Sequence, residues 1–298
     1  MQYLNLNHLF YFYTIASEGS IRDACRKLSL TQSTLSNQLK ELEFCFGKNL
    51  FEREAKGLKL NDTGKKVLDY ATEIFRLRDE LTVYVQHQGM EKVQVIRMGI
   101  VPGFMKRDIY QISRGLLGQN QAFIKSKQDC LSNLVSELAA KTIDVILSDR
   151  PILHDTYKLK NRELDKRQLV FVGHKKFANL AANFPHSLRS IPFCSYSEES
   201  IAQQILDKYF KANHISPNTI AEFDDVDLLK LFAQDGQGIV AIPAELAKES
   251  LASEQLLQIG THGDLQISTW VITLQDGKLD DYLRKCIDEI KQNQIMMG

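Results

Sequence analysis

The chain has 298 residues, enough for two or three domains with their own cores, and its 44% hydrophobic and 25% charged residues are ordinary for a globular protein. Its 37 basic and 37 acidic residues cancel, no apolar run approaches the length of a membrane span, and no signal-peptide layout opens it. We therefore expect a cytoplasmic protein without a membrane partner. Five scattered cysteines without a CxxC pair indicate free thiols and exclude a disulfide or zinc framework.

Three helices are expected at the start of the chain. Apolar residues at helical spacing between residues 5 and 17 predict a core helix. Residues 20 to 47 predict two shorter helices, because Ser20 and Thr31 can each cap a helix start and Gly47 can end the second helix. Ser29-Leu30 interrupts the apolar pattern and marks the turn between the two.

The polar face of the second helix is unusual. It carries hydroxyls and amides where a solvated helix usually carries Glu and Lys, and such groups match base edges in the major groove and the phosphates beside it. Two helices joined by a short turn form a helix-turn-helix. The alternative interpretation is a capped surface helix pair in an α-rich protein. The residues expected at DNA are Gln32, Ser33, Thr34, Ser36, Asn37, Gln38 and Lys40, with the caps Ser20 and Thr31.

The next segment, NLFEREAKGLKLN, predicts a small hairpin with Lys56-Gly57 at its tip. A hairpin after a recognition helix is a wing, and we expect Arg53, Lys56 and Lys59 near the phosphate backbone. Each lysine fits an ordinary solvated hairpin equally well. Residues 20 to 66 hold ten basic and six acidic residues, a modest surplus that predicts weak non-specific DNA affinity with a shallow salt dependence.

A long helix is expected from a cap at Asn61 or Asp62 to about Gln88, followed by a hinge at Gly89. Its apolar residues recur at spacings of 3, 4, 3, 4 and 3, which is typical of a seam that pairs with another helix. The position of the helix, between a DNA-binding head and a large C-terminal part, favours self-association, and the alternative is packing on its own domain. The seam residues are Val67, Tyr70, Ile74, Leu77, Leu81 and Tyr84.

From Val93 onward the pattern alternates between strands and helices. It predicts strands at 95–101, 122–124, 143–147, 169–173, 219–223, 238–243 and 267–274, and helices at 106–117, 130–140, 200–213, 226–234 and 279–292. Such alternation predicts parallel α/β sheets with right-handed crossovers. Two lobes accommodate the length better than one sheet, with the last strand and helix returning to the first lobe.

A ligand is expected beyond the carboxyl ends of these strands, where helix N-termini present backbone N–H groups. Each residue there alone is more often a cap or turn than a ligand contact. Carboxylates are the preferred ligands of hard cations, so Asp149 and Asp224 suggest a cation effector, although Asp129 and Asp225 fit helix caps equally well. The candidate effector residues are Pro102, Gly103, Phe104, Asp129, Cys130, Ser148, Asp149, Tyr196, Ser197, Phe223 and Asp224.

The sequence resembles the LysR-type transcriptional regulators over nearly its whole length. The resemblance rests on NHLFYFYTIASEGSIRDACRKLSLTQSTLSNQLKELE, on Leu50, Phe51 and Arg53, on the NDTG that opens the long helix, and on DVILSDRP (144–151) and GQGIVAIP (236–243). Asn37 and Ser33 depart from the arginine and proline that many members carry there, and Asn61 from a common threonine. These departures put the base contacts, but not DNA binding, in doubt.

The resemblance implies an α/β protein with an all-α-plus-wing head. It places a winged helix-turn-helix domain at 1–61, a linker and dimerisation helix at 62–89, and a two-lobed periplasmic-binding-protein-like effector domain at 90–298. Lobe I is expected at about 93–164 and 264–298, and lobe II at about 165–263. The implied protein is a homodimer or homotetramer that binds double-stranded DNA and holds a small-molecule or ion effector between its lobes.

Three further segments, NLNHLFYFY, LSDRP and AEFDDVDLLKLF (221–232), resemble the subgroup that activates sodium/proton antiporter genes, where sodium or alkaline pH is the cue. The alternatives are a regulator that senses an organic acid or aromatic metabolite, and a ligand-binding module with a vestigial DNA head. The sequence has no nucleophile elbow, glycine-rich phosphate loop or metal-ligand spacing, so we expect no enzyme activity, cofactor or metal site.

Overall fold

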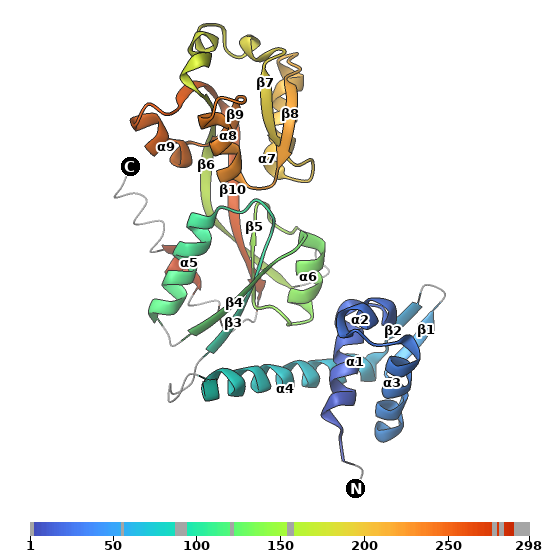
Figure 1. Cartoon of the computed structure of the whole chain (residues 1–298). Coiled ribbons are helices and arrows are strands. Elements are labelled where there is room, and N and C mark those ends of the chain that lie inside the picture. The colour runs from blue at the N-terminus through green and yellow to red at the C-terminus, as the bar shows by residue number, and fades with distance from the viewer. Residues whose placement is uncertain are drawn as a thin grey trace. The chain divides into compact units, whose positions relative to one another are not determined.

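The structure is a computed structural model that describes residues 3–54, 57–86, 94–119, 122–153, 158–275, 279 and 283–288. The chain forms two compact units, shown as ribbons in Figure 1. Unit 1 contains Met1–Arg97, Leu117–Lys125 and Ser132–Asp144, and unit 2 contains Met98–Leu116, Ser126–Leu131 and Val145–Gly298. The predicted hinge at Gly89 lies outside the described residues.

Three helices open unit 1, as predicted: α1 (Leu6–Glu18), α2 (Ile21–Leu28) and α3 (Gln32–Phe46). The hydroxyls of Ser20 and Thr31 accept hydrogen bonds from backbone N–H groups three residues further on, at 3.0 Å and 3.2 Å. Gly47 ends α3 with φ +64°, which glycine adopts without a Cβ penalty. These local signals fix where α2 and α3 begin and where α3 ends.

The predicted wing is present. Strands β1 (Phe51–Glu54) and β2 (Gly57–Leu60) pair antiparallel, with Phe51 opposite Leu60. The Glu43 side chain of α3 accepts a hydrogen bond of 2.7 Å from the backbone N–H of Leu50, which ties the start of the hairpin to the helix before it. The tip residues 55–56 lie outside the described residues.

Helix α4 (Asp62–Gln86) is the predicted long helix. Asn61, rather than Asp62, is its cap, because the Asn61 side chain accepts a hydrogen bond of 2.8 Å from the N–H of Gly64. A Cβ at Gly64 would lie 2.0 Å from the carbonyl oxygen of Leu50, so only glycine permits this approach of helix and hairpin. Among the described residues, no helix combines the length and apolar character needed to cross a bilayer.

The main sheet has the strand order β4-β3-β5-β10-β6-β9. The strands are β3 (Gln94–Ile100), β4 (Ala122–Gln128), β5 (Val145–Ser148), β6 (Leu159–Gly173), β9 (Val240–Pro243) and β10 (Leu257–Leu274). Strands β3 and β5 are parallel, but β10 runs antiparallel to both β5 and β6, and β6 antiparallel to β9. The predicted parallel pairing is confirmed for β3 and β5, but it is wrong for the pairs that β6 and β10 form, so the main sheet is mixed.

Two long strands account for this difference. Strands β6 and β10 span 15 and 18 residues and pair along most of their length, from beside β5 to beside β9 (Figure 1). The pattern analysis found only 169–173 and 267–274. The first half of β6, LKNRELDK, is rich in charged residues, and the first half of β10, LQIGTHGDLQ, has no apolar run. Long antiparallel strands of this kind carry no continuous apolar run.

Unit 2 also contains a second, two-stranded parallel sheet of β7 (Pro192–Tyr196) and β8 (Asn218–Phe223). The helices α5 (Lys106–Gln119), α7 (Ile201–Ala212) and α8 (Val226–Gln234) match the prediction, as does α6 (Leu131–Ala139), most of which belongs to unit 1. The segments η1 (Lys175–Asn183), η2 (His186–Leu188) and α9 (Ala244–Ala252) were not predicted. Of the predicted closing helix 279–292, residues 283–288 are helical, and 280–282 and 289–292 lie outside the described residues.

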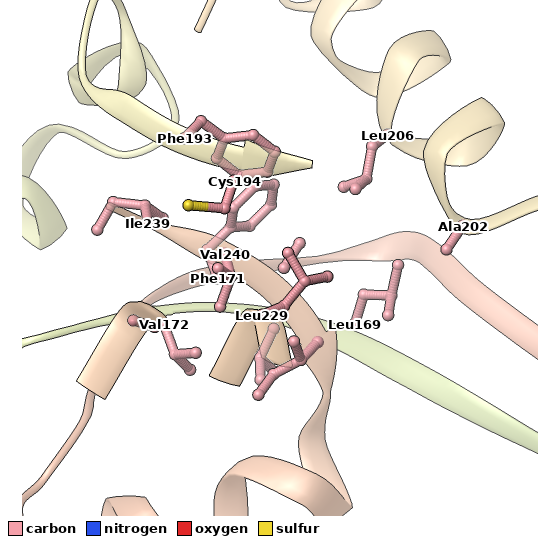
Figure 2. Close-up of a cluster of buried hydrophobic side chains, with 14 of the residues drawn as sticks. Leu169, Phe171, Val172, Phe193, Cys194, Ala202, Leu206, Leu229, Ile239 and Val240 are labelled. Atoms are coloured by element: carbon pink, nitrogen blue, oxygen red, sulfur yellow. The ribbon is translucent and has the colours of Figure 1, made fainter. Parts of the chain in front are cut away.

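A large hydrophobic cluster holds this part of unit 2 together. Figure 2 shows side chains from β6, β7, α7, α8 and β9 converging on it, with Phe171 and Phe193 among its largest members. Their ring centroids are 6.2 Å apart, in the range of favourable tilted aromatic pairs. The cluster therefore fixes the positions from which α7 and α8 begin.

Candidate nucleic-acid interface and effector site

The polar face of α3 is open to solvent. Its apolar face packs inward through Leu35, Leu39 and Leu42. Of the residues expected at DNA, Ser36 and Gln38 are half-buried. The following are exposed: Thr31, Gln32, Ser33, Thr34, Asn37 and Lys40. These residues remain predicted DNA contacts.

The hydroxyls at the start of α3 also bond to one another. The Thr31 hydroxyl lies 3.0 Å from that of Ser33 and 2.8 Å from that of Thr34. In the described part of the chain, Gln32 and Lys40 have no side-chain partner. Ser20 is different, because its hydroxyl donates to the Asp23 carboxylate at 2.6 Å while capping α2, which makes it chiefly a structural residue.

The structure describes only part of the predicted wing contacts. Arg53 lies in β1, but its side chain is outside the description, as is the whole of Lys56. Lys59 is exposed on β2, opposite Glu52 in the strand register. These three residues remain predicted phosphate contacts.

The apolar seam of α4 divides into two sets. Val67 and Ile74 pack against the core of the head, as the alternative interpretation had it. The other four seam residues expose about half of their surface or more: Tyr70 74%, Leu77 58%, Leu81 62% and Tyr84 48%. We call these four residues the exposed stripe of α4. Large apolar side chains that recur in register on one helix face are typical of a helix-pairing surface.

The candidate effector residues gather at the helix starts of unit 2. The Asp149 carboxylate, just after β5, accepts a hydrogen bond of 3.1 Å from the N–H of Ile201, the first residue of α7. It also forms a two-pronged ion pair with Arg150, at 2.9 Å and 3.1 Å. Arg150 in turn donates to the carbonyl oxygen of Glu199 at 2.7 Å. Hydrogen bonding to Asp149 raises the pKa of Arg150.

A second set of contacts lies at the start of α8. Asp225 caps the helix by accepting from the N–H of Asp227 at 2.9 Å. Lys106, at the start of α5, forms ion pairs with both carboxylates, at 2.7 Å and 3.1 Å. Hydrogen bonds to these two carboxylates raise the pKa of Lys106, and the bond from Lys106 lowers the pKa of Asp225. Beside them the Ser197 hydroxyl donates to the Asp224 carboxylate.

Three candidate residues direct their side chains into the core instead. Phe104, Ser148 and Tyr196 are 6%, 0% and 5% exposed. The Tyr196 hydroxyl donates to the carbonyl oxygen of Ala241 at 2.9 Å, and burial raises its pKa. Residues 193–196 of β7 are all buried, on both faces of the strand, and Ser197, the residue after it, is half-buried. Burial of these three side chains does not test their predicted role, so their contact with an effector stays a prediction.

The remaining candidates are half-buried or exposed. Asp129 accepts from the N–H of Cys130 at 2.8 Å and pairs with Lys127 at 3.3 Å, while Phe223 packs against Phe232. Pro102 and Gly103 are exposed. Within the described residues no group of three or more His, Cys, Asp or Glu side chains is arranged to hold a metal ion. Asp149, Asp224 and Asp129 instead each bond to a neighbouring side chain.

Two cations that pair with carboxylates at these helix starts, Arg150 and Lys106, were not among the candidate effector residues. Arg150 follows directly after a predicted contact, in the LSDRP segment. Lys106 begins α5, where a positive charge is unfavourable to the helix dipole. The structure shows what offsets this, because Lys106 pairs with Asp225 and Asp227.

Two family models match the chain. Residues 6–65 match the bacterial regulatory helix-turn-helix proteins of the lysR family, and residues 124–294 match the LysR substrate-binding domain. The first match spans the whole head, including α3 and the wing. The second match contains the starts of both α7 and α8.

Individual relatives agree with this assignment. The transcriptional activator protein NhaR of Escherichia coli (strain K12) is 24% identical over 267 residues, covering 87% of this chain and 86% of that protein. A crystal structure of full-length CbnR with its target DNA has a TM-score of 0.58 at 17% identity, covering 96% of this chain and 100% of that chain. ArgP from Mycobacterium tuberculosis has a TM-score of 0.63 at 16% identity, with 97% of each chain covered. At these identities the two structures support the fold alone.

Proposed function

Since the chain belongs to the LysR family and is a DNA-binding transcriptional regulator with an effector-binding domain, we propose that its α3 face reads a promoter under the control of an effector. The observation that carries this proposal is the solvent exposure of the polar α3 residues on a capped helix-turn-helix head. Hydroxyls, amides and one lysine at the start of a recognition helix suit base edges and phosphates.

In this proposal each part of the chain has one role. Residues 1–61 bind DNA, 62–89 associate with another copy to form a homodimer or homotetramer, and 90–298 bind the effector between two lobes. The exposed stripe of α4 supports the self-association, because its apolar surface would be buried by a second helix. The polar groups at the starts of α7 and α8 support an effector site there.

A gel-shift experiment with the DNA upstream of the chain's own gene tests the DNA-binding role. Lys40→Ala should weaken binding to all sequences and lower the salt slope by about 1, whereas Gln32→Ala should cost roughly 1–3 kcal/mol at one operator position. Lys208→Ala removes the same charge from α7 and serves as the control, which should leave binding unchanged. Equal binding by all four proteins would contradict the proposed role of α3.

The finer proposal concerns the target gene and the cue. The resemblance to the antiporter-regulator subgroup and the similarity to the activator NhaR favour a sodium/proton antiporter gene activated by sodium or alkaline pH. A promoter reporter for an antiporter gene beside this one tests it. An Asp149→Asn and Asp224→Asn double variant should lose the sodium response, and an unchanged response would discard the cation effector.

The alternative effector is an organic acid or aromatic metabolite. A thermal-shift screen of salts against organic acids separates the two, since a ligand that binds only the folded state raises the melting temperature. The other alternative, a ligand-binding module with a vestigial head, predicts ligand binding without any gel shift.

A further inference from the structure

The carboxylate of Asp149 lies beside the N-terminus of α7. The first N–H groups of a helix have no partner within the helix, and together with the helix dipole they attract negative charge. Here the Ser200 hydroxyl accepts from the N–H of Ala202 at 3.2 Å, and the Asp149 carboxylate accepts from the N–H of Ile201 at 3.1 Å. Asp149 lies 52 residues before Ile201 in sequence, so this is a tertiary contact rather than a local cap.

Arg150 holds that carboxylate in place. Its guanidinium donates to both Asp149 oxygens, at 2.9 Å and 3.1 Å, and to the carbonyl oxygen of Glu199 at 2.7 Å. Its backbone N–H donates to the buried Ser148 hydroxyl at 3.2 Å, which fixes the turn after β5. The Asp149 and Arg150 side chains are 23% and 33% exposed, so the pair is shielded but open at one side.

This arrangement has the parts of a carboxylate-binding site. A forked guanidinium and a helix N–H are the donors that proteins commonly present to a carboxylate ligand. The ligand position between them is filled by a side chain of the protein itself. The N-terminus of α8 also has carboxylates of the protein beside it. These are Asp225 and Asp227, and both form ion pairs with Lys106.

We propose that Asp149 is a specificity-determining residue of the effector site, acting as an internal carboxylate ligand at the N-terminus of α7. It excludes an organic acid from that position and directs the site toward an uncharged or cationic effector. This inference rests on the proposed effector role of the region and names the class of ligand that the region accepts.

Removal of the internal ligand should create a binding site for an external one. In the Asp149→Ala variant, Arg150 and the Ile201 N–H lose their anion, and the deleted carboxylate leaves space for a small carboxylate. Acetate is the probe because it carries the deleted carboxylate; since Asp149→Ala keeps the Cβ, the methyl group of acetate would extend toward the open side of the pair. Hydrogen bonds to charged groups are strong enough that the gain in acetate affinity should be about tenfold or more.

The experiment is a thermal-shift titration of the full-length protein with sodium acetate, against sodium chloride at equal ionic strength. The Asp149→Ala variant should show a saturable rise in melting temperature specific to acetate, half-complete at an acetate concentration about tenfold or more below any wild-type response. Asp207→Ala removes a carboxylate from the same helix, where Asp207 accepts from Gln203 at 2.8 Å, and should behave as wild type. Asp149→Asn keeps the side-chain shape, and it should bind no acetate because the space stays filled.

An equal acetate response in wild type and Asp149→Ala, or an equal gain in Asp207→Ala, overturns the inference. If Asp149→Ala does not fold, Arg150→Gln on the wild-type background takes its place. This variant lacks the guanidinium. Neither it nor the wild type should bind acetate. Acetate binding by the wild type that is lost in Arg150→Gln would overturn the inference. The gel shift is independent of these results. If Asp149→Ala gains acetate binding but the protein shifts no DNA, this inference holds and the proposed function is wrong. If the protein shifts DNA but Asp149→Ala gains no acetate binding, the proposed function holds and this inference is wrong.

Discussion

The buried ion pair between Arg167 of β6 and Asp108 of α5 gives the sharpest stability prediction. The two guanidinium nitrogens of Arg167 donate to the Asp108 oxygens at 2.8 Å and 2.7 Å, and its Nε donates to Asp165 at 2.7 Å. The Arg167 side chain is 4% exposed and that of Asp108 is 0% exposed. Replacing Arg167 with Met keeps the apolar stem and leaves the Asp108 carboxylate buried without its cation.

The expected loss is about 3–5 kcal/mol, the usual cost of removing one partner from a buried pair. Burial raises the pKa of the Asp108 carboxyl, and Arg167 opposes that rise. A raised carboxyl pKa contributes stability that is present below the unfolded pKa and is lost as pH rises through the folded pKa. Without Arg167 the folded pKa rises further, so Arg167→Met should be destabilised more at about pH 8 than at about pH 5.

Urea unfolding followed by tryptophan fluorescence measures this directly. Trp270 is the single tryptophan of the sequence and lies on β10 beside β5 and β6, so it reports on the unit that contains the pair. The double variant Asp108→Leu, Arg167→Met removes both charges and should recover most of the lost stability. A loss for Arg167→Met that is small, equal at both pH values, or unchanged in the double variant would refute the reasoning.

Three further predictions follow from the backbone and the surface. Gly103→Ala should cost roughly 1–3 kcal/mol in the same urea experiment, because Gly103 has φ +76° and a Cβ there would lie 2.9 Å from the carbonyl oxygen of Asp224. Asn61→Ala should cost about 1 kcal/mol through loss of the α4 cap, and more than Asp62→Ala, as followed by thermal unfolding monitored by circular dichroism. Leu81→Glu should lower the oligomeric state in sedimentation experiments, whereas Thr82→Glu, beside the exposed stripe of α4, should not; equal behaviour of the two would contradict pairing through that stripe.

The head could be predicted nearly to the residue because its signals are local. A cap such as Ser20 or Thr31 acts on N–H groups within three residues, and Gly47 ends its helix through its own backbone angle. Helical periodicity then indicates which face is buried. Whether Asn61 or Asp62 caps α4 could not be decided, since both side chains can accept the same N–H.

The effector half was less predictable because its important contacts join distant residues. The carboxylate of Asp149 and the N–H of Ile201 meet through the packing of β5 and α7, and no local pattern marks that pair. Tyr196 was assigned to the ligand because it ends a strand, yet its side chain is buried and its hydroxyl donates to the carbonyl oxygen of the distant Ala241. A stretch rich in charged residues likewise concealed the first half of β6 and hence the antiparallel pairing of β6 with β10.

The long strands β6 and β10 also set a mechanical limit on the effector half. A loop between two bodies leaves them free to rotate, but a paired ribbon that continues from beside β5 to beside β9 resists both shear and separation. The ribbon should bend most easily where its pairing register shifts and the hydrogen-bond ladder is interrupted. These shifts lie between Gln258 and Gly260, between Thr261 and Gln266, and between Thr269 and Trp270. An opening or closing of the effector half would therefore have to deform this paired ribbon, and its stiffness would limit the size of the movement.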